Sequence, residues 1–232
     1  MYLEIKDVKK SYGENGSYIQ VLKGVNTGVE KGQMCVIQGT SGSGKSTLLN
    51  CIGGLDTMDS GSVKVDGTEI FGMKNNDLSN YRRDNLGFIF QFYNLIPNLT
   101  ALENVELMKD IVDVDIDGLD VLDSVGLKEH ANQFPAQLSG GEQQRVSIAR
   151  AVSKQPTMLL CDEPTGALDS KTGVLILSLL QDMSNSQNTT VVIVTHNSIL
   201  AEAADKVIRI KNGQIESIVV NENPKKVVDL EW

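Results

Sequence analysis

A glycine-rich segment after a short apolar run constrains this chain more than any other feature. The run Met34–Gln38 is typical of a buried strand, residues 39–46 fit the pattern G-x-x-x-x-G-K-[ST], and a helical pattern follows from Lys45 to about Gly53. Glycines let such a loop bend so that successive backbone N–H groups point inward, and the N-terminus of the next helix favours negative charge. The sequence therefore predicts a phosphate-binding loop between a strand and a helix.

Each residue of this loop is a candidate contact for ATP. In loops of this pattern the lysine, here Lys45, reaches the β- and γ-phosphates, and the hydroxyl that follows, here Ser46, can bind Mg²⁺. The cofactors that the loop predicts are therefore ATP and Mg²⁺. The candidate ATP-binding residues are Gly39, Thr40, Ser41, Gly42, Ser43, Gly44, Lys45, Ser46 and Thr47.

A second apolar run ends in two adjacent carboxylates, Asp162 and Glu163. Asp162 falls at the carboxyl end of the expected strand, where α/β sheets bind ligands, and we expect it to hold Mg²⁺ through water. Glu163 would point to the other side, where it could polarise an attacking water. Taken alone, the pair also fits a solvated acidic turn before Pro164.

A Ser-Gly-Gly turn within Leu138–Arg145 opens a further helical pattern. Ser139 and the amides of Gly140 and Gly141 are candidates for a phosphate contact at a helix N-terminus. A capping box, with Ser139 as N-cap and Glu142 three residues on, explains the same residues, and both interpretations can hold together. One chain has one phosphate loop but two phosphate-facing helix starts, which predicts a dimer that buries nucleotide between two copies.

The periodicity along the rest of the chain predicts an α/β fold. Strand patterns over 2–8 and 19–29 and a hairpin signal at Asp66-Gly67 indicate a mainly β first part. Helical patterns follow over 101–112, 118–125 and 142–153, then strands at 157–162 and 190–195 around a helix at 171–187, and a hairpin at Asn212-Gly213. Strands that alternate with helices indicate a parallel sheet covered on both faces.

Composition narrows the class of protein further. The chain has 232 residues, of which 41% are hydrophobic, and a net charge of −9, which argues for a buried core and against a nucleic-acid partner. Cys35, Cys51 and Cys161 form no CxxC pair, so we expect reduced cytosolic thiols rather than a metal site. No secretory signal is visible, and no apolar run approaches the roughly 18 residues of a spanning helix. If this protein acts at a membrane, we therefore expect it to do so through a partner protein.

With the two flanking motifs, Leu138–Arg145 (LSGGEQQR) resembles the signature motif of ABC-transporter ATPases, and the resemblance covers essentially the whole chain. It implies a P-loop NTPase (RecA-like) parallel-sheet core with an N-terminal antiparallel β part. It also implies a single domain over 1–232, with a nucleotide-binding core at 1–91 and 155–232 and an inserted helical subdomain at 92–154. Such an ATPase works as a homodimer, or paired with a similar ATPase, on a separate transmembrane permease at the cytoplasmic face of the membrane.

The resemblance assigns four further residues. Tyr12 is similar to the aromatic residue that stacks on adenine, and Gln91 to the glutamine that touches Mg²⁺ and water. Asp169 is similar to the loop residue that meets a partner's phosphate loop, and His196 to the histidine that contacts the γ-phosphate. Tyr12 also fits a surface tyrosine at a strand end, and most aromatic residues around Gln91, in 88–93, are expected in the core. The implied catalytic residues are Glu163 and His196, the metal residues Ser46, Gln91 and Asp162, and the residues that act across the dimer Ser139, Gly140, Gly141 and Asp169.

Within the family, the segments 90–105, 163–172 and 223–232 resemble the group of macrolide-exporter, lipoprotein-release, antimicrobial-peptide-export and cell-division (FtsE-type) ATPases. The group implies export of a peptide, a drug or a lipid-linked substrate. The stretch Met108–Ser124 is a few residues shorter than is usual in the lipoprotein-release and macrolide types, which favours a peptide or drug. A mechanical ATPase of the FtsE type, which acts through a permease-like partner on cell-wall enzymes, stays open as an alternative.

Two more distant alternatives account for less of the sequence. DNA-repair or chromosome-organising ATPases of the same superfamily normally carry long coiled coils or zinc insertions, whereas only a compact helical segment separates the ATP motifs here. A nucleotide kinase would leave the motif at Leu138–Arg145 unexplained.

Overall fold

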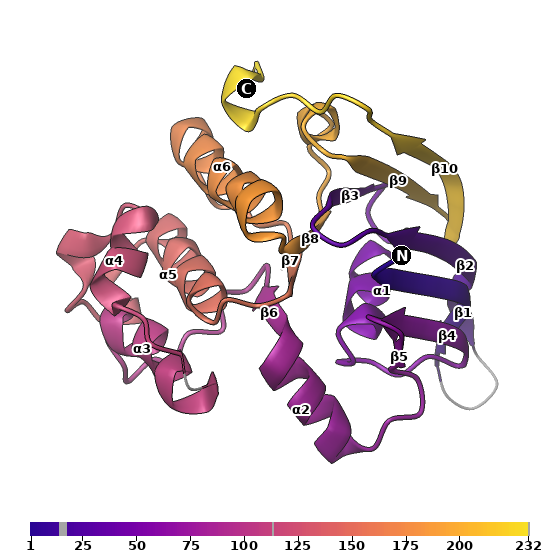
Figure 1. The fold of residues 1–232 in the computed structure, drawn as a ribbon, viewed down its shortest axis with the longest axis horizontal. Coiled ribbons are helices and arrows are strands. Elements are labelled where there is room, and N and C mark those ends of the chain that lie inside the picture. The colour runs from indigo at the N-terminus through magenta and orange to yellow at the C-terminus, as the bar shows by residue number, and fades with distance from the viewer. Residues whose placement is uncertain (14–17, 113, 232) are drawn as a thin grey trace.

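The computed structural model describes residues 1–13, 18–112 and 114–231, so Trp232 of the segment compared above lies outside the described residues (Figure 1). The strands are β1 (Leu3–Tyr12), β2 (Ile19–Val29), β3 (Met34–Gln38), β4 (Ser60–Val65), β5 (Thr68–Glu69), β6 (Leu86–Ile89), β7 (Met158–Asp162), β8 (Thr190–Val194), β9 (Lys206–Lys211) and β10 (Gln214–Val220). The helices are α1 (Lys45–Ile52), α2 (Asn75–Asn85), α3 (Ala101–Val112), α4 (Gly118–Ser124), α5 (Gly140–Ser153) and α6 (Ser170–Gln187). Short 3₁₀ turns cover Lys128–His130, Pro135–Gln137, Ile199–Glu202 and Val227–Asp229.

Two sheets organise these elements. A mainly parallel sheet has the strand order β10-β9-β3-β8-β7-β6, and an antiparallel sheet has the order β2-β1-β4-β5. Strands β3, β6, β7, β8 and β9 run parallel, while β10 pairs antiparallel with β9. The predicted α/β class, with a parallel core and an N-terminal antiparallel part, is confirmed.

Both predicted hairpins form where the sequence places Asp-Gly and Asn-Gly. Asp66 and Gly67 have φ values of 48° and 76°, and Asn212 and Gly213 have values of 52° and 81°. Two-residue hairpin turns of type I′ need positive φ at both central residues, which glycine adopts freely and Asn or Asp tolerate. Local turn chemistry therefore sets the register of β4 with β5 and of β9 with β10.

The parallel sheet is packed on both faces, as its uniformly apolar strands predict. Along β7, Leu159 and Cys161 belong to an apolar cluster with α3 to α6, whereas Met158 and Leu160 belong to a second cluster with α1 and the antiparallel sheet. Figure 1 shows these two groups of elements on opposite sides of β7 and β8. The first cluster runs without a break from the sheet into the helices of 92–154, so the proposed division into core and helical subdomain stays a prediction.

Helix α2 is an element that the sequence patterns above do not predict. Its eleven residues are strongly polar, and Tyr81 is its one buried residue. The Tyr81 hydroxyl donates to the Ile52 carbonyl oxygen at 3.2 Å, and Lys154 Nζ donates to the carbonyl oxygens of Arg82 and Leu86 at the helix end. Tertiary contacts rather than an apolar face therefore hold α2 in place.

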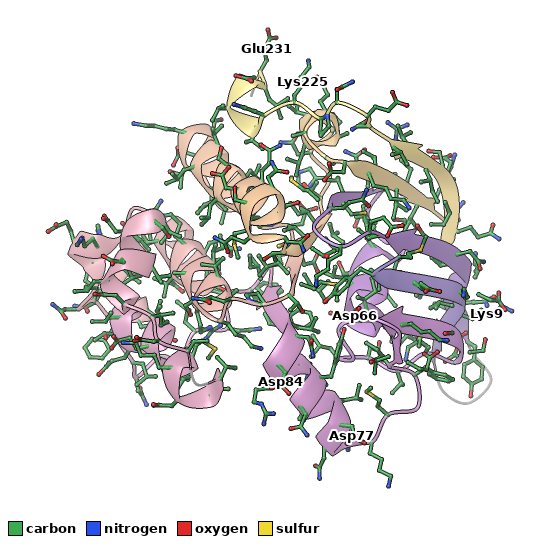
Figure 2. All side chains as sticks on the ribbon, in the orientation of Figure 1. Lys9, Asp66, Asp77, Asp84, Lys225 and Glu231 are labelled. Atoms are coloured by element: carbon green, nitrogen blue, oxygen red, sulfur yellow. The ribbon has the colours of Figure 1, made fainter. Side chains whose placement is uncertain are left out.

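The described residues carry charged side chains on the outside of the molecule and include no helix that could span a membrane. Figure 2 shows charged side chains such as Asp77, Asp84 and Lys225 on the outside of the molecule. None of the helices of 1–13, 18–112 and 114–231 combines the length and hydropathy needed to span a bilayer. The three cysteines are free and buried, as expected for core thiols.

Because the parallel sheet is packed on both faces, we expect core substitutions on either face to destabilise the protein to a similar extent. Leu159→Ala and Leu160→Ala should each lower the free energy of unfolding by about 2–5 kcal/mol, because each leaves a cavity in a close-packed core. Urea denaturation followed by circular dichroism measures both changes. Val219 lies in β10 and is 42% exposed, so Val219→Ala is the control. It should change the free energy of unfolding by less than about 0.5 kcal/mol. A negligible loss in either leucine variant would contradict a sheet that is packed on both faces.

Candidate functional site

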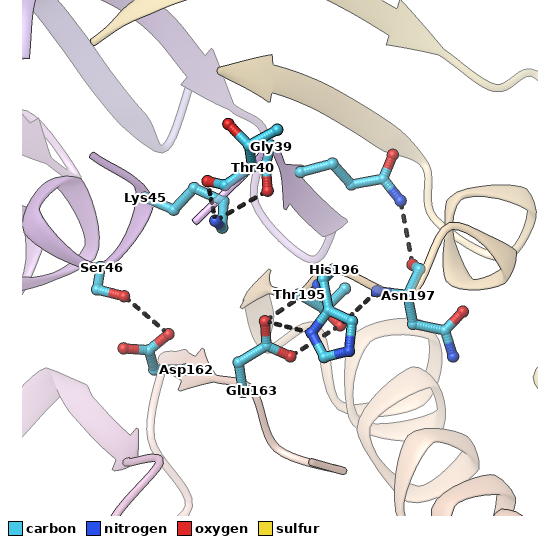
Figure 3. Close-up of polar contacts among 10 residues, drawn as sticks. Gly39, Thr40, Lys45, Ser46, Asp162, Glu163, Thr195, His196 and Asn197 are labelled. Atoms are coloured by element: carbon cyan, nitrogen blue, oxygen red, sulfur yellow. Dashed lines mark hydrogen bonds and ion pairs between the residues drawn. The ribbon is translucent and has the colours of Figure 1, made fainter. Parts of the chain in front are cut away.

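The predicted phosphate loop follows β3 and turns directly into α1. Gly44 is the N-cap of α1, and its φ of 101° is a left-handed conformation that glycine adopts without strain. A Cβ on Gly39 would lie 2.2 Å from the carbonyl oxygen of Ile210 in β9, so only glycine fits the start of the loop. Lys45 Nζ donates to the carbonyl oxygens of Gly39 and Thr40 at 2.9 Å each, which holds its ammonium within the loop (Figure 3).

Asp162, the last residue of β7, faces the start of α1. Ser46 Oγ donates to Asp162 Oδ1 at 3.1 Å (Figure 3). Burial raises the pKa of the Asp162 carboxyl, and the neighbouring charge of Glu163 adds to this, while the Ser46 bond and Lys45 oppose it. The contact brings together two hard oxygen ligands of the kind that Mg²⁺ prefers.

Glu163 turns away from Asp162 toward the end of β8. Its φ of 49° lies in the left-handed region, and its N–H donates to the carbonyl oxygen of Val194 at 2.9 Å. Its carboxylate accepts from Thr195 Oγ1 at 3.2 Å and from the His196 backbone N–H at 3.0 Å, and His196 Nδ1 lies 2.9 Å from Oε1. Two successive carboxylates therefore point in different directions, as Figure 3 shows.

Thr195 and Gln38 hold the site together, although the sequence patterns do not single them out. Thr195 is 2% exposed, and its hydroxyl also accepts from the Asn197 N–H at 3.1 Å. Gln38 Nε2 donates to the Asn197 carbonyl oxygen at 3.1 Å, which ties the end of β3 to the segment after His196. The signal that could have found them is a polar residue at the carboxyl end of an otherwise apolar strand, because a buried polar group needs a partner.

A cavity of about 820 Å³ opens where these segments meet. The tertiary structure thus gathers most of the predicted loop with both carboxylates, the glutamine and the histidine. The predicted residues that line it are Gly39, Ser41, Gly42, Gly44, Lys45, Ser46, Thr47, Gln91, Asp162, Glu163 and His196.

Gln91 reaches this cavity from an exposed turn after β6. The prediction that the aromatic residues of 88–93 are mostly in the core is wrong, because Phe92 is 79% exposed and the other three are half-buried. Strand β6 ends at Ile89, so the sheet no longer covers the residues beyond it. The polar Gln91 therefore needs no buried partner.

Tyr12 ends β1 and is 43% exposed. Its hydroxyl donates to the carboxylate of Asp56, in the loop after α1. Tyr12 is not among the residues that line the cavity, so its adenine contact stays a prediction.

Ser139, Gly140 and Gly141 lie at the start of α5 and are not among the cavity residues either. Ser139 Oγ accepts from the Glu142 N–H at 3.3 Å, while Glu142 Oε2 accepts from the Ser139 N–H and Oγ at 2.7 Å each. The predicted capping box is therefore confirmed. Ser139 and Gly140 are exposed and accessible to a second molecule.

Asp169 caps the next helix of the site. It is the N-cap of α6, where Oδ1 accepts from the Thr172 N–H at 3.0 Å and Oδ2 from the Thr172 hydroxyl at 2.8 Å. These bonds lower the pKa of the Asp169 carboxyl. Within one copy its role is to cap α6, and the predicted contact across a dimer stays a prediction.

Residues 22–166 match the ABC transporter family. The chain belongs to this family. The matched segment contains the phosphate loop, both carboxylates and the Ser-Gly-Gly turn, whereas Tyr12 and His196 lie outside it. Membership confirms the predicted class of ATP-binding subunit and ATPase, and it accounts for the motif that a nucleotide kinase leaves unexplained.

Two of the curated relatives are named for export. It is 41% identical over 218 residues to the bacitracin export ATP-binding protein BceA of Halalkalibacterium halodurans, covering 92% of this chain and 86% of BceA. It is 42% identical over 218 residues to the macrolide export ATP-binding/permease protein MacB of Shigella flexneri, covering 92% of this chain and 34% of MacB. The chain spans about half the length of two Mycoplasma relatives, which it matches at 44% and 41% identity.

A solved structure confirms the fold. The ATP-binding cassette MJ0796 of Methanocaldococcus jannaschii, described as a dimer in a post-hydrolysis state bound to ADP and Pi, matches with a TM-score of 0.89 and 41% identity. The match covers 94% of this chain and 98% of that chain. The predicted P-loop NTPase fold is therefore that of an ABC cassette.

We expect that replacing the half-buried carboxyl of Asp162 stabilises the protein. In the absence of nucleotide and Mg²⁺, Asp162→Asn should raise the free energy of unfolding at pH 7 by about 0.5–1 kcal/mol, a small range because Asp162 is half-buried and solvent screens its charge. The pKa of Asp162 is raised in the folded state, so its ionisation opposes folding, and this penalty disappears as pH falls through the raised pKa. The gain should therefore shrink as pH falls from neutrality. Urea denaturation in EDTA at several pH values measures it.

Asp169→Ala is the matched contrast. It removes the N-cap of α6 and should lower stability by about 1 kcal/mol. A loss of stability at pH 7 in Asp162→Asn, comparable to the loss in Asp169→Ala, would contradict the unfavourable burial of Asp162.

Proposed function

We propose that this chain binds and hydrolyses ATP as one half of a nucleotide-sandwich dimer that powers a separate membrane permease. One observation carries the proposal: a single cavity gathers the phosphate loop, the Ser46–Asp162 contact and Glu163 with its partner His196. The loop would bind the triphosphate, Ser46 and Asp162 would bind the metal ion, and Glu163 would activate water. These are the parts that phosphoryl transfer to water requires.

The residues present fit Mg²⁺. In the described ranges no group of three or more His, Cys, Asp or Glu could hold a metal ion, and Mg²⁺ is usually held by one or two carboxylates together with substrate phosphates. Ser46 and Asp162 would hold it, with Gln91 at the same cavity. Burial of the Asp162 carboxyl leaves a charge that a cation would balance. When bound, Mg²⁺ would neutralise charge on the β- and γ-phosphates.

Glu163 is the proposed general base. Its carboxylate would orient the attacking water and polarise its O–H bond toward the γ-phosphate. Thr195 and the His196 N–H fix the carboxylate, so water would meet it in one orientation. The His196 side chain is 79% exposed, and we propose that its ring contacts the γ-phosphate while Nδ1 faces Glu163.

A second copy, or a similar ATPase, would complete the site. Ser139, Gly140 and Gly141 stand at the start of α5, where backbone N–H groups and the helix dipole favour a γ-phosphate. Asp169 would contact the phosphate loop of the other copy. The dimeric description of MJ0796 supports this arrangement. Release of the bridging phosphate would then open the dimer.

The partner that we propose is a transmembrane permease, with this chain bound at the cytoplasmic face of the membrane. The name of MacB joins ATP-binding and permease functions, and BceA is named for bacitracin export. These names, together with the short stretch at 108–124, support a peptide or drug as the class of substrate.

The sandwich mechanism predicts a dimer that is trapped by removing the general base. Glu163→Gln should form a dimer with Mg-ATP, because ATP still bridges two copies, and should release phosphate at least about 10²-fold more slowly than the wild type. Light scattering with and without Mg-ATP measures the size, and a phosphate-release assay measures the rate. A monomer under every condition, with hydrolysis equal to that of the wild type, would contradict both the dimer and the role of Glu163.

The contact between Thr195 and Glu163 predicts a selective loss of hydrolysis. Thr195→Val keeps the shape of the side chain and removes its hydroxyl, so hydrolysis should fall at least about tenfold, the value of one hydrogen bond to a charged group. Thr190→Val is the matched control, because Thr190 is buried at the other end of β8 and, among the described residues, its hydroxyl accepts only from the Gly32 N–H. Thermal unfolding should show similar losses of stability in both variants. Equal hydrolysis in the two variants would show that Thr195 has a structural role alone.

A further inference from the structure

The Tyr12 side chain is held at two points. Its hydroxyl donates to Asp56 Oδ2, in the loop after α1. The Lys10 ammonium lies 4.8 Å from the centre of the Tyr12 ring, from the same side of β1. A side chain that is 43% exposed is therefore fixed at both its ring and its hydroxyl.

Asp56 is itself held in one orientation. Its Oδ1 accepts from Lys10 Nζ at 2.7 Å and from the Thr57 N–H at 2.7 Å, and Lys10 Nζ also donates to the Thr57 carbonyl oxygen at 2.7 Å. The Lys10 side chain is only 9% exposed, so this ion pair is shielded from solvent. Burial pushes the pKa of Asp56 up, but the bonds from Lys10 and Tyr12 outweigh it and hold the pKa below its usual range. Asp56 is thus a charged, oriented acceptor for the Tyr12 hydroxyl.

We propose that Asp56 is a positioning residue for nucleotide binding: backed by Lys10, it holds the Tyr12 ring at a fixed place relative to the phosphate loop, as a preformed platform for the base of ATP. The proposal rests on the proposed function, ATP binding, and on the stacking of Tyr12 on adenine that the sequence predicts. A ring that is already ordered loses less conformational freedom when a ligand stacks on it, so binding is tighter. Asp56 follows α1, which begins at the phosphate loop, so the tether also fixes the ring relative to that loop.

Asp56 does not read the identity of the base. Its oxygens are occupied by Lys10, Thr57 and Tyr12, and the platform offers only a ring face. Every base has a π-face, so stacking tolerates different bases. The network should therefore tighten the binding of nucleoside triphosphates in general and leave inorganic tripolyphosphate, which has no base, unaffected.

The test is calorimetric titration of the full chain with ATP and with tripolyphosphate. Tyr12→Ala should raise the Kd for ATP roughly 5- to 150-fold, the range for one lost base stack. Tyr12→Phe keeps the ring and removes the tether, and should raise the Kd roughly two- to twelvefold, the range for immobilising one free side chain on binding. Asp56→Asn should do the same, and combining it with Tyr12→Phe should add little, because both remove one contact. The Kd for tripolyphosphate should stay at the wild-type value throughout.

Asp59→Asn is the control for charge, since Asp59 is an exposed residue of the same loop whose side chain makes no hydrogen bond among the described residues. Unchanged ATP binding in both Tyr12→Phe and Asp56→Asn, with weaker binding in Tyr12→Ala, would overturn the tether and leave the stacking role intact. Unchanged binding in Tyr12→Ala would overturn the stacking role and the proposal together. Parallel losses for ATP and tripolyphosphate would overturn it as well, because they would mark a general structural defect. The exposed Tyr12→Phe change keeps the test valid if Asp56→Asn does not fold.

Discussion

Parallel hydrogen bonding among β3, β8 and β7 is the constraint on which the site depends. The register pairs Ile37 with Val194 and Val194 with Asp162, so three strands from distant parts of the chain end at one edge. The residues that continue past each strand are then neighbours: the phosphate loop, the Thr195-His196 pair and Glu163. Parallel strands are joined by crossovers that cover both faces, which is why this edge needs two apolar clusters to support it.

The edge also carries features that oppose folding. Asp162 keeps a carboxyl whose pKa burial raises, and Glu163 occupies a left-handed backbone conformation that a side chain with a Cβ disfavours. Both features separate two adjacent carboxylates, one toward Ser46 and one toward Thr195. The arrangement of these two carboxylates therefore lowers the stability of the fold, and packing in the core offsets this loss.

Structural and proposed functional roles coincide at the helix starts. Ser139 and Asp169 are N-caps in the folded chain, and both are exposed residues that we propose act across a dimer. A capping side chain is already oriented by its own helix, so it can present a fixed surface to a second copy. The tether of Tyr12 to Asp56 follows the same logic, because an exposed ring is ordered before any ligand arrives.

The sequence by itself determined the features that depend on neighbouring residues. These include the glycine loop before α1, the Asp-Gly and Asn-Gly hairpins, the capping box of α5 and the alternation of apolar strands with helices, because turn chemistry and periodicity act over a few residues. Only the tertiary structure decided which strand ends meet, that Thr195 supports Glu163 and that Asp56 supports Tyr12, because the order of strands in a sheet leaves no local pattern. It also decided that polar α2 forms and that Phe92 is exposed, since contacts with Ile52 and Lys154 hold α2 and the sheet ends before Phe92.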